Sequence, residues 1–254
     1  MLRSFLKIAL ISALLSPLCQ AEPLDGLALV RTSRDKACIQ AQDGKQLKNG
    51  EVSKAEGLNI EVPKDSFASL ALSNNMALIF TDDTKAKILK FELLDEPQKK
   101  LSQESCPSVF EIDIESGTMF MSRAEPKAKS KFIVKTKLGN FEALGENLRV
   151  SANGKELLIY AHDAAVNYYP IDSSSPQYIG MGYFAKIKSE NGKIKLTREK
   201  LASDKSVENI DFFESAKDAW KSTYFDYTNP EKPVARRILS PNFWARQERI
   251  LPKN

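Results

Sequence analysis

The sequence predicts an all-β protein of many short strands, and three observations indicate it. Apolar and polar residues alternate with a period of two through most of the chain. Residues typical of turns separate these runs, at Asn74-Asn75, Asp82-Asp83, Asn153-Gly154 and Asn191-Gly192. The 254 residues are 42% hydrophobic, which suffices for a packed core. We therefore expect a sandwich or solenoid-like arrangement, followed by a short amphipathic helix and a basic, aromatic tail.

The alternation places thirteen strands. Asn153-Gly154 is the clearest hairpin turn among them, since Asn-Gly tolerates the positive φ angles of a tight turn. The expected strands are Leu58–Val62, Ala68–Leu72, Ala77–Phe80, Ile88–Leu94, Val109–Ile114, Thr118–Met121, Lys131–Thr136, Asn140–Leu144, Leu148–Ser151, Glu156–Ala161, Val166–Tyr169, Tyr183–Lys188 and Lys193–Thr197.

Residues 1–21 have the pattern of an export signal. Arg3 and Lys7 precede an apolar core, Ile8–Leu18, and small residues lead up to Ala21. The core is shorter than the roughly 20 residues that span a bilayer. We expect cleavage after Ala21 and a periplasmic or secreted protein.

Composition excludes several kinds of site. The net charge of +4 is too small for a dedicated nucleic-acid binder. One histidine and three cysteines exclude zinc sites built on His and Cys clusters, and no metal or cofactor is expected. After signal removal Cys38 and Cys106 remain, and in an oxidising compartment we expect a disulfide between them, two unconnected thiols being the alternative.

Two neighbouring segments carry opposite charge. Glu111, Asp113 and Glu115 alternate with Phe110, Ile112 and Ile114, so that one side faces the core and the other is acidic. The second segment carries a basic face, formed by Lys127, Lys129, Lys131, Lys135 and Lys137. If both lie in one sheet, with Thr118–Met121 between them, the rows could pair. A calcium site and an anion surface are the functional alternatives to a solvated face whose lysines protect a sheet edge.

Two longer stretches resemble a known family. GLNIEVPKDSFASLALSNNMALIFTDDTKAKI, from Gly57 to Ile88, resembles the opening of FecR-type extracytoplasmic domains. Ser116 to Phe120 and SKFIVKTKLGNFEALGENLRVS, from Ser130 to Ser151, resemble its later glycine-marked strands. The resemblance covers about Gly26 to Leu196, with departures at Lys137, Gly145-Glu146 and His162-Asp163. It implies an extracytoplasmic all-β binding or scaffolding module at residues 22–200, without the transmembrane helix or cytoplasmic anti-sigma segment of the family's best-known members.

Catalytic groups are scarce in the sequence. The only histidine, His162, stands beside Asp163, and neighbours on a strand point to opposite faces, so that Asp163 could not readily orient it. We expect a partly exposed histidine without a catalytic role. A glycosidase that uses two carboxylates remains an alternative function, because the sequence does not give the distance between acidic residues.

The spacing of apolar residues changes after Leu201 from a period of two to a helical period. Phe213, Ala216, Trp220 and Tyr224 recur at helical spacing, which predicts an amphipathic helix over Ile210–Tyr224 with Asn209 as its N-cap. Between Glu231 and Asn254 six basic residues face two acidic ones. That tail is either a strap over the β domain or an arm that binds a partner. The arm's expected contact residues are Arg236, Arg237, Phe243, Trp244 and Arg246.

Together these patterns predict an exported, noncatalytic, FecR-like module that recognises an envelope protein or an anionic polymer. An envelope glycan hydrolase with paired carboxylates and a structural assembly subunit are the alternatives. No nucleic acid and no stable membrane insertion after signal cleavage are expected. The sequence leaves the oligomeric state open.

Overall fold

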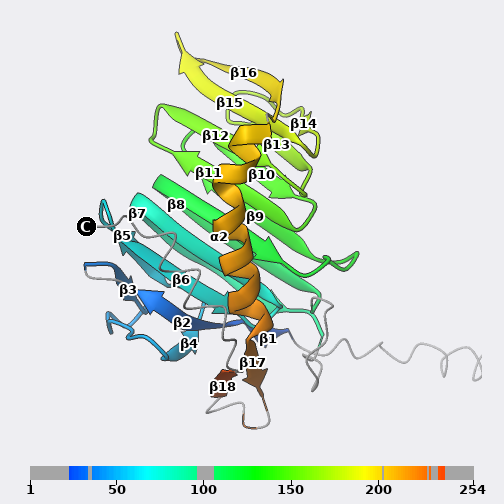
Figure 1. Ribbon diagram of the computed structural model, residues 1–254. Helices are drawn as coiled ribbons and strands as arrows, with labels where there is room; N and C mark the ends of the chain where they lie inside the picture. Colours follow the sequence, from blue (N-terminus) through cyan, green and yellow to red (C-terminus); the bar gives the residue numbers. More distant parts are fainter. Residues whose placement is uncertain are drawn as a thin grey trace, which may run out of the picture.

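The computed structural model describes residues 23–33, 36–95, 106–201, 203–227, 229 and 234–237. In these residues it has a sixteen-stranded sheet, a helix laid across one face of that sheet, and a separate two-stranded sheet (Figure 1). The predicted all-β fold class is therefore confirmed. The strand pairing shows that the large sheet is folded on itself into two layers.

The first layer carries the helix. It contains the first half of β7 and the second half of β8. These halves pair with each other from Met76 opposite Arg123 to Thr81 opposite Thr118. In order across the sheet its strands are β4 (Val52–Lys54), β2 (Leu27–Ser33), β6 (Phe67–Leu72), β7 (Met76–Leu93), β8 (Ser108–Arg123), β11 (Asn147–Ala152), β12 (Glu156–Ala161), β15 (Tyr183–Glu190) and β16 (Lys193–Lys200).

The second layer contains the other halves of β7 and β8. Beyond β8 comes a parallel neighbour, β9, which pairs Val109 with Lys131. A parallel pair needs a crossover connection, and the second half of β8 with the loop after it supplies one. Across this layer lie β3 (Cys38–Gln40), β5 (Asn59–Val62), β7, β8, β9 (Lys131–Thr136), β10 (Gly139–Ala143), β13 (Val166–Pro170) and β14 (Gln177–Ile179), while β1 (Leu24–Asp25) pairs with the end of β7.

A bend in β7 and β8 joins the two layers. The register of this pair shifts between Thr81 and Lys85, as at a β-bulge. Opposite the shift Gly117 has a φ of +94°, and the N–H of Thr118 donates to Thr84 Oγ1 at 3.0 Å. A Cβ on Gly117 would lie 2.2 Å from Thr84 Cα, so that only glycine allows the two strands to approach this closely. The bend thus turns one sheet into two facing layers.

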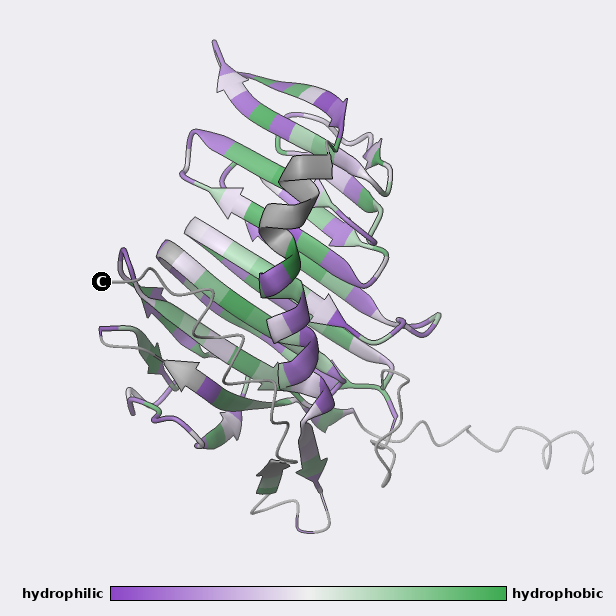
Figure 2. Ribbon diagram, in the orientation of Figure 1, coloured by the Kyte–Doolittle hydropathy of each residue, from purple (hydrophilic) through white to green (hydrophobic). Residues whose placement is uncertain are grey.

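One hydrophobic core fills the space between the layers. It draws on nearly every strand of both, and its largest fully buried rings include Phe80, Phe110, Phe132 and Tyr168. The rings of Phe110 and Phe132 stack at 5.2 Å, and that of Phe91 meets Phe110 edge-on at 5.4 Å. Figure 2 shows the alternation of apolar and polar residues along the strands. The alternation of apolar and polar residues in the sequence therefore indicates which side of each strand faces the core.

Arg123 closes one end of this core. Its side chain is 6% exposed, and its guanidinium donates to the carbonyl oxygens of Ala143 and Gly145 at 2.9 and 2.6 Å. Burial lowers the pKa of Arg123 to about 10. The residue links the end of β8 to the last residue of β10 and to the turn that follows it.

Helix α2 (Ser203–Lys221) packs on the outer face of the first layer, over β6, β7 and β8. Phe213 and Trp220 are buried against Ile79 and Phe120, and the ring of Phe212 stacks on Phe120 at 4.2 Å. The expected bounds were wrong. The helix begins six residues before Asn209, which is therefore not its N-cap, and ends before Tyr224, which lies on a strand.

Two pairs of expected strands are single long ones. Ala77–Phe80 and Ile88–Leu94 both belong to β7, and Val109–Ile114 and Thr118–Met121 both belong to β8, because the chain bends at Asp82-Asp83 and Gly117 without leaving the sheet. Seven strands were not predicted, namely β1, β2, β3, β4 and β14 with the two-stranded sheet of β17 (Thr223–Asp226) and β18 (Val234–Arg237).

The hairpin at Asn153-Gly154 is confirmed, but with different geometry. Gly154 has a φ of +78°, whereas Asn153 accepts the backbone N–H groups of Lys155 and Glu156 on its side-chain oxygen. Both central residues have positive φ instead at Asn191 (53°) and Gly192 (76°), between β15 and β16. That turn is the tight two-residue one.

The bend gives a direct test. Gly117→Ala should lower the free energy of unfolding by about 3 kcal/mol, because the added methyl group meets the backbone of Thr84 at a positive φ. Gly192→Ala is the matched control, since its φ is also positive but nothing lies within 4 Å of its added Cβ. It should cost about 1 kcal/mol. Urea unfolding measures both, and equal costs would contradict the close approach.

Candidate functional site

The acidic row and the basic face lie together on the outer face of the second layer. Phe110, Ile112 and Ile114 are buried, as predicted, and the carboxylates between them point outward. Lys135 reaches Glu111 at 2.7 Å, and Lys137 reaches Glu115 at 3.0 Å. The two rows therefore do pair, across the direct parallel contact of β8 and β9.

The basic face is less regular than its spacing suggested. Only Lys131 and Lys135 lie on β9. Lys127 and Lys129 precede that strand, and Lys137 lies in the turn to β10. Thr118–Met121 does not lie between the rows, because it belongs to the part of β8 that has crossed into the first layer.

Lysines of β7 flank the acidic row from its other side. Lys87 is the register partner of Asp113, and Lys90 is that of Glu111. A hydrogen bond from Lys137 is the main reason why the pKa of Glu115 lies below its ordinary value. Among the described residues no group of three or more His, Cys, Asp or Glu side chains could hold a metal ion. The arrangement is a charge ladder between strands.

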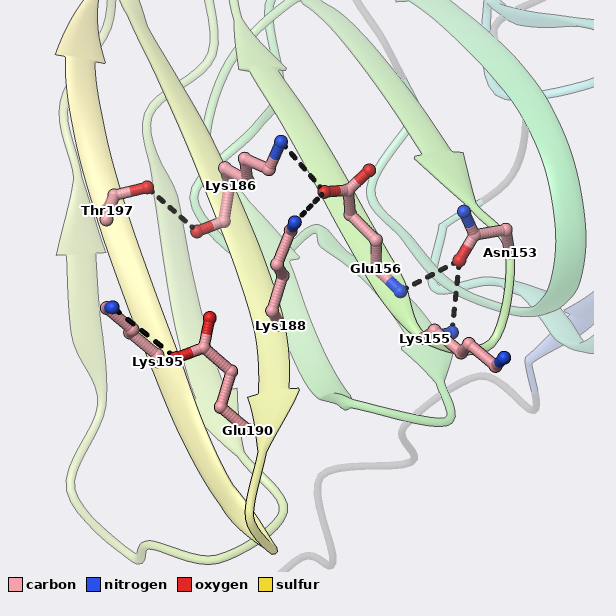
Figure 3. Close-up of polar contacts among 8 residues, drawn as sticks. All are labelled: Asn153, Lys155, Glu156, Lys186, Lys188, Glu190, Lys195 and Thr197. Atoms are coloured by element: carbon pink, nitrogen blue, oxygen red, sulfur yellow. Dashed lines mark hydrogen bonds and ion pairs between the residues drawn. The ribbon is translucent and has the colours of Figure 1, made fainter.

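A second ionic cluster lies on the outer face of β12, β15 and β16 (Figure 3). Lys186 and Lys188 both approach Glu156 Oε1, at 2.9 and 3.3 Å, and Lys195 approaches Glu190 at 3.4 Å. The hydrogen bond from Lys186 lowers the pKa of Glu156. Sequence analysis missed this cluster because Glu156 precedes the two lysines by thirty residues or more.

Cys38 and Cys106 are both free thiols in the structure. The register links Cys38 to Glu61 and Glu61 to Lys85, whereas Cys106 precedes Pro107, which pairs with Leu94. Along β7 these partners are separated by on the order of 25 Å. A disulfide requires Cα atoms less than about 7 Å apart. The expected bond is not formed in this structure.

His162 lies half-buried beneath α2. Its ring meets that of Phe213 edge-on at 4.7 Å, and burial is the main cause that lowers the pKa of His162. Asp163 turns instead to Asn147, whose amide donates to it at 2.8 Å. The histidine is thus part of the contact between helix and sheet, and no carboxylate among the described side chains hydrogen-bonds to it.

The tail lies mostly outside the described residues, as do the expected signal peptide and Phe243, Trp244 and Arg246. Arg236 and Arg237 lie on β18, opposite Tyr224 and Thr223 of β17. That small sheet is held to the first layer by Phe225, which packs against Leu27 and Leu29. The small sheet therefore lies against β2 and β6 of the first layer.

The most exposed apolar surface was not predicted. Of eight large hydrophobic side chains that are exposed in the described part of the chain, five fall between residues 169 and 183. Ile171 is 71% exposed, Met181 62% and Tyr178 58%. We call Tyr169, Ile171, Tyr178, Met181 and Tyr183 the end patch. By register it extends along the β13–β14 pair, with Ile171 beyond one end of the pair and Met181 beyond the other.

Two members of the end patch lie next to a glycine. A Cβ on Gly180 would lie 3.4 Å from the ring of Tyr183 and 3.7 Å from that of Tyr178, so the two tyrosines flank it. Between Tyr169 and Tyr178 the chain also carries three serines in a row, Ser173 to Ser175. Tyrosine, serine and glycine together are typical of protein-binding loops. From the sequence alone this composition indicates only a loop, because the strand within it, β14, has just three residues.

The charge ladder predicts the response to calcium. Millimolar CaCl₂ should leave the melting temperature unchanged, because lysines already neutralise Glu111 and Glu115. Lys135→Gln combined with Lys137→Gln should change stability by about 1 kcal/mol or less. Scanning calorimetry measures both, and a calcium-dependent rise in the melting temperature of the unaltered protein would contradict the ladder.

His162 predicts a pH dependence. Its pKa in the folded protein lies below the ordinary value of 6.5, so the unfolded chain binds the proton more tightly. Its contribution to stability is therefore present above pH 6.5 and is lost as the pH falls below that value. His162→Gln should lose less stability than the unaltered protein between pH 7.5 and pH 5, by denaturant unfolding. Identical losses would contradict this environment.

Comparisons with known proteins give a distant likeness. No family model matches the sequence, and no curated protein matches it. The solved structures that are similar include two from Parabacteroides distasonis ATCC 8503, each described as a "putative anti-sigma factor". The first has a TM-score of 0.44 and 14% identity, over 60% of this chain and 64% of that one. The second has a TM-score of 0.35 and 12% identity, over 62% and 61%. The chain thus matches less than two thirds of either structure's length.

Proposed function

We propose that this chain is an exported, noncatalytic recognition module that binds a protein of the bacterial envelope through the end patch. The observation that carries this proposal is the concentration of exposed side chains between Tyr169 and Tyr183. Exposed apolar patches mark interaction sites, and tyrosine and methionine are enriched at protein interfaces. The resemblance to FecR-type domains and the expected export signal support the same role.

Aliphatic side chains favour a protein over an anionic polymer as the partner of this patch. Ile171 and Met181 are its two most exposed members, and neither can donate or accept a strong hydrogen bond. A protein surface can bury them, and a charged polymer gains little from doing so. Arg198, which bonds the neighbouring Gln177 at 3.2 Å, would form part of a polar rim.

Two of the glutamates that border pockets are poorly suited to the chemistry of a glycan hydrolase. A glycosidase needs one carboxyl group whose pKa is raised, so that it can donate a proton. Glu115 and Glu156 each border an open pocket, of about 320 and 330 Å³, and lysines lower the pKa of both. These groups are stabilised as anions, which is the wrong state for a general acid.

The described residues contain no helix long and apolar enough to cross a membrane. We propose that residues 1–21 direct export and are removed, so that the protein isolated from its natural cell begins at Glu22. The basic tail, with Arg236, Arg237, Phe243, Trp244 and Arg246, is proposed as a second partner contact.

Site-specific photo-crosslinking tests the proposal. A benzophenone amino acid in place of Tyr178 should give a discrete protein adduct in living cells. The benzophenone amino acid in place of Lys64, which is exposed in the β5–β6 connection, should give no such adduct. Tyr178→Ser with Met181→Ser should reduce the adduct from a third position, Phe243, at least tenfold if both surfaces hold one partner. Adducts of equal yield at Tyr178 and Lys64, or none at Tyr178, would contradict the proposal.

A further inference from the structure

Strand β16 ends the first layer, and in the described residues no strand pairs with its outer side. The tight turn at Asn191 and Gly192 makes Glu190 and Lys193 a hydrogen-bonded pair of the β15–β16 hairpin. Such pairs alternate along an antiparallel ladder. The backbone N–H and C=O groups of residues 194, 196, 198 and 200 therefore point away from β15, toward the open edge.

The first of these groups already holds a carboxylate. The N–H of Ile194 donates to Asp172 Oδ2 at 2.8 Å, and Asp172 comes from the connection between β13 and β14. At Leu196 and Arg198 the described part of the chain provides no acceptor for the edge N–H groups. The edge thus carries one amide that is bonded by an acidic side chain and then amides that bond no acceptor among the described residues.

The side chains of β16 form two different rows. Ile194 and Leu196 point inward and pack, half-buried, on the end of the core. Lys193 and Lys195 point outward. Lys195 is the register partner of Lys188 in the ionic cluster of Figure 3, and Lys193 is that of Glu190. Over the whole strand four basic residues, Lys193, Lys195, Arg198 and Lys200, face one acidic residue, Glu199. Lysines guard an edge against indiscriminate pairing, and the same charges select an acidic strand.

We propose that β16 accepts an extended segment of the partner protein as an added strand, in which acidic residues alternate with apolar ones. This inference rests on the proposed function, since the end patch lies at the same end of the sheet and Gln177 joins it to Arg198. Backbone hydrogen bonds to Leu196 and Arg198 hold the segment. Its apolar side chains cover Ile194 and Leu196, and its carboxylates face Lys193 and Lys195. A second copy of β16 would instead set lysine against lysine.

A designed peptide tests the edge directly. The probe is a fluorescein-labelled octapeptide of alternating Glu and Val, and the control peptide alternates Lys and Val. The full chain should bind the Glu-Val peptide saturably and the Lys-Val peptide at least tenfold more weakly, by fluorescence anisotropy. Hydrogen exchange at Leu196 and Arg198 should slow on binding. Equal binding of the two peptides, or no protection of these amides, would overturn the proposal.

Two variants separate the backbone contact from the side chains. Leu196→Pro removes an N–H that points away from β15, so that the hairpin is kept. The substitution should weaken binding of the Glu-Val peptide at least tenfold. Leu196→Val keeps the N–H and should bind like the unaltered protein. Asp172→Ala frees the amide of Ile194 and should tighten binding severalfold. Unfolding curves establish that each variant folds, and unchanged binding by Leu196→Pro would refute strand addition.

The two proposals fail separately. A protein adduct at Tyr178 without strand addition would leave the end patch as the binding surface and remove β16 from it. Self-association of the chain through β16, seen as Leu196→Pro-sensitive dimers in sedimentation, would replace the acidic partner by a second copy and overturn this inference.

Discussion

The close approach of β7 and β8 at Gly117 is the constraint on which the rest of the structure depends. At this point the two longest strands leave one layer and enter the other, and the hydroxyl of Thr84 bonds the backbone of Thr118 across them. Because both strands bend together, they stay paired on both sides of the bend. A single sheet can then enclose a single core, without a second set of strands.

The same bend decides where the molecule can bind. Two layers that share their central strands must each end in an edge, and here the far edges are β14 and β16. Asp172 and Gln177 both reach from the second layer to β16, but only Asp172 bonds its backbone edge, whereas Gln177 accepts from the side chain of Arg198. Five of the eight exposed large hydrophobic side chains in the described residues belong to the end patch, while the broad outer faces carry paired charges or the helix. Recognition at the open end is a consequence of how the sheet folds.

The sequence predicted what alternation can encode and missed what depends on contacts between distant residues. Phe110, Ile112 and Ile114 face the core because period two is a property of any strand. The sequence predicted a turn at the bend in β7, because Asp82-Asp83 is typical of turns. Only the pairing of β7 with β8 keeps these residues in the sheet. Strand β2 was missed because both of its faces are buried, Leu27 and Leu29 beneath Phe225 and Ala28 and Val30 in the core, which erases the alternation.

The candidate sites follow the same division. The charge rows were visible because each lies within one short stretch of the sequence, whereas the end patch joins residues of β13, β14 and β15 through a loop whose composition gives no period. Asn209 was a reasonable N-cap by residue type, but the helix begins six residues earlier, at Ser203, and it packs on Phe120 through Phe212 and Phe213. Local preference is weak against tertiary packing of this size.

Native-state hydrogen exchange tests most directly whether one bend holds two layers around one core. The amides of Phe120 in the first layer and Ile112 in the second should exchange through the same global opening, with equal free energies. Gly117→Ala should lower both by the same amount. If the substitution accelerated exchange in one layer and left the other unchanged, the layers would be separate cooperative units, and the bend could not be what holds them around a single core.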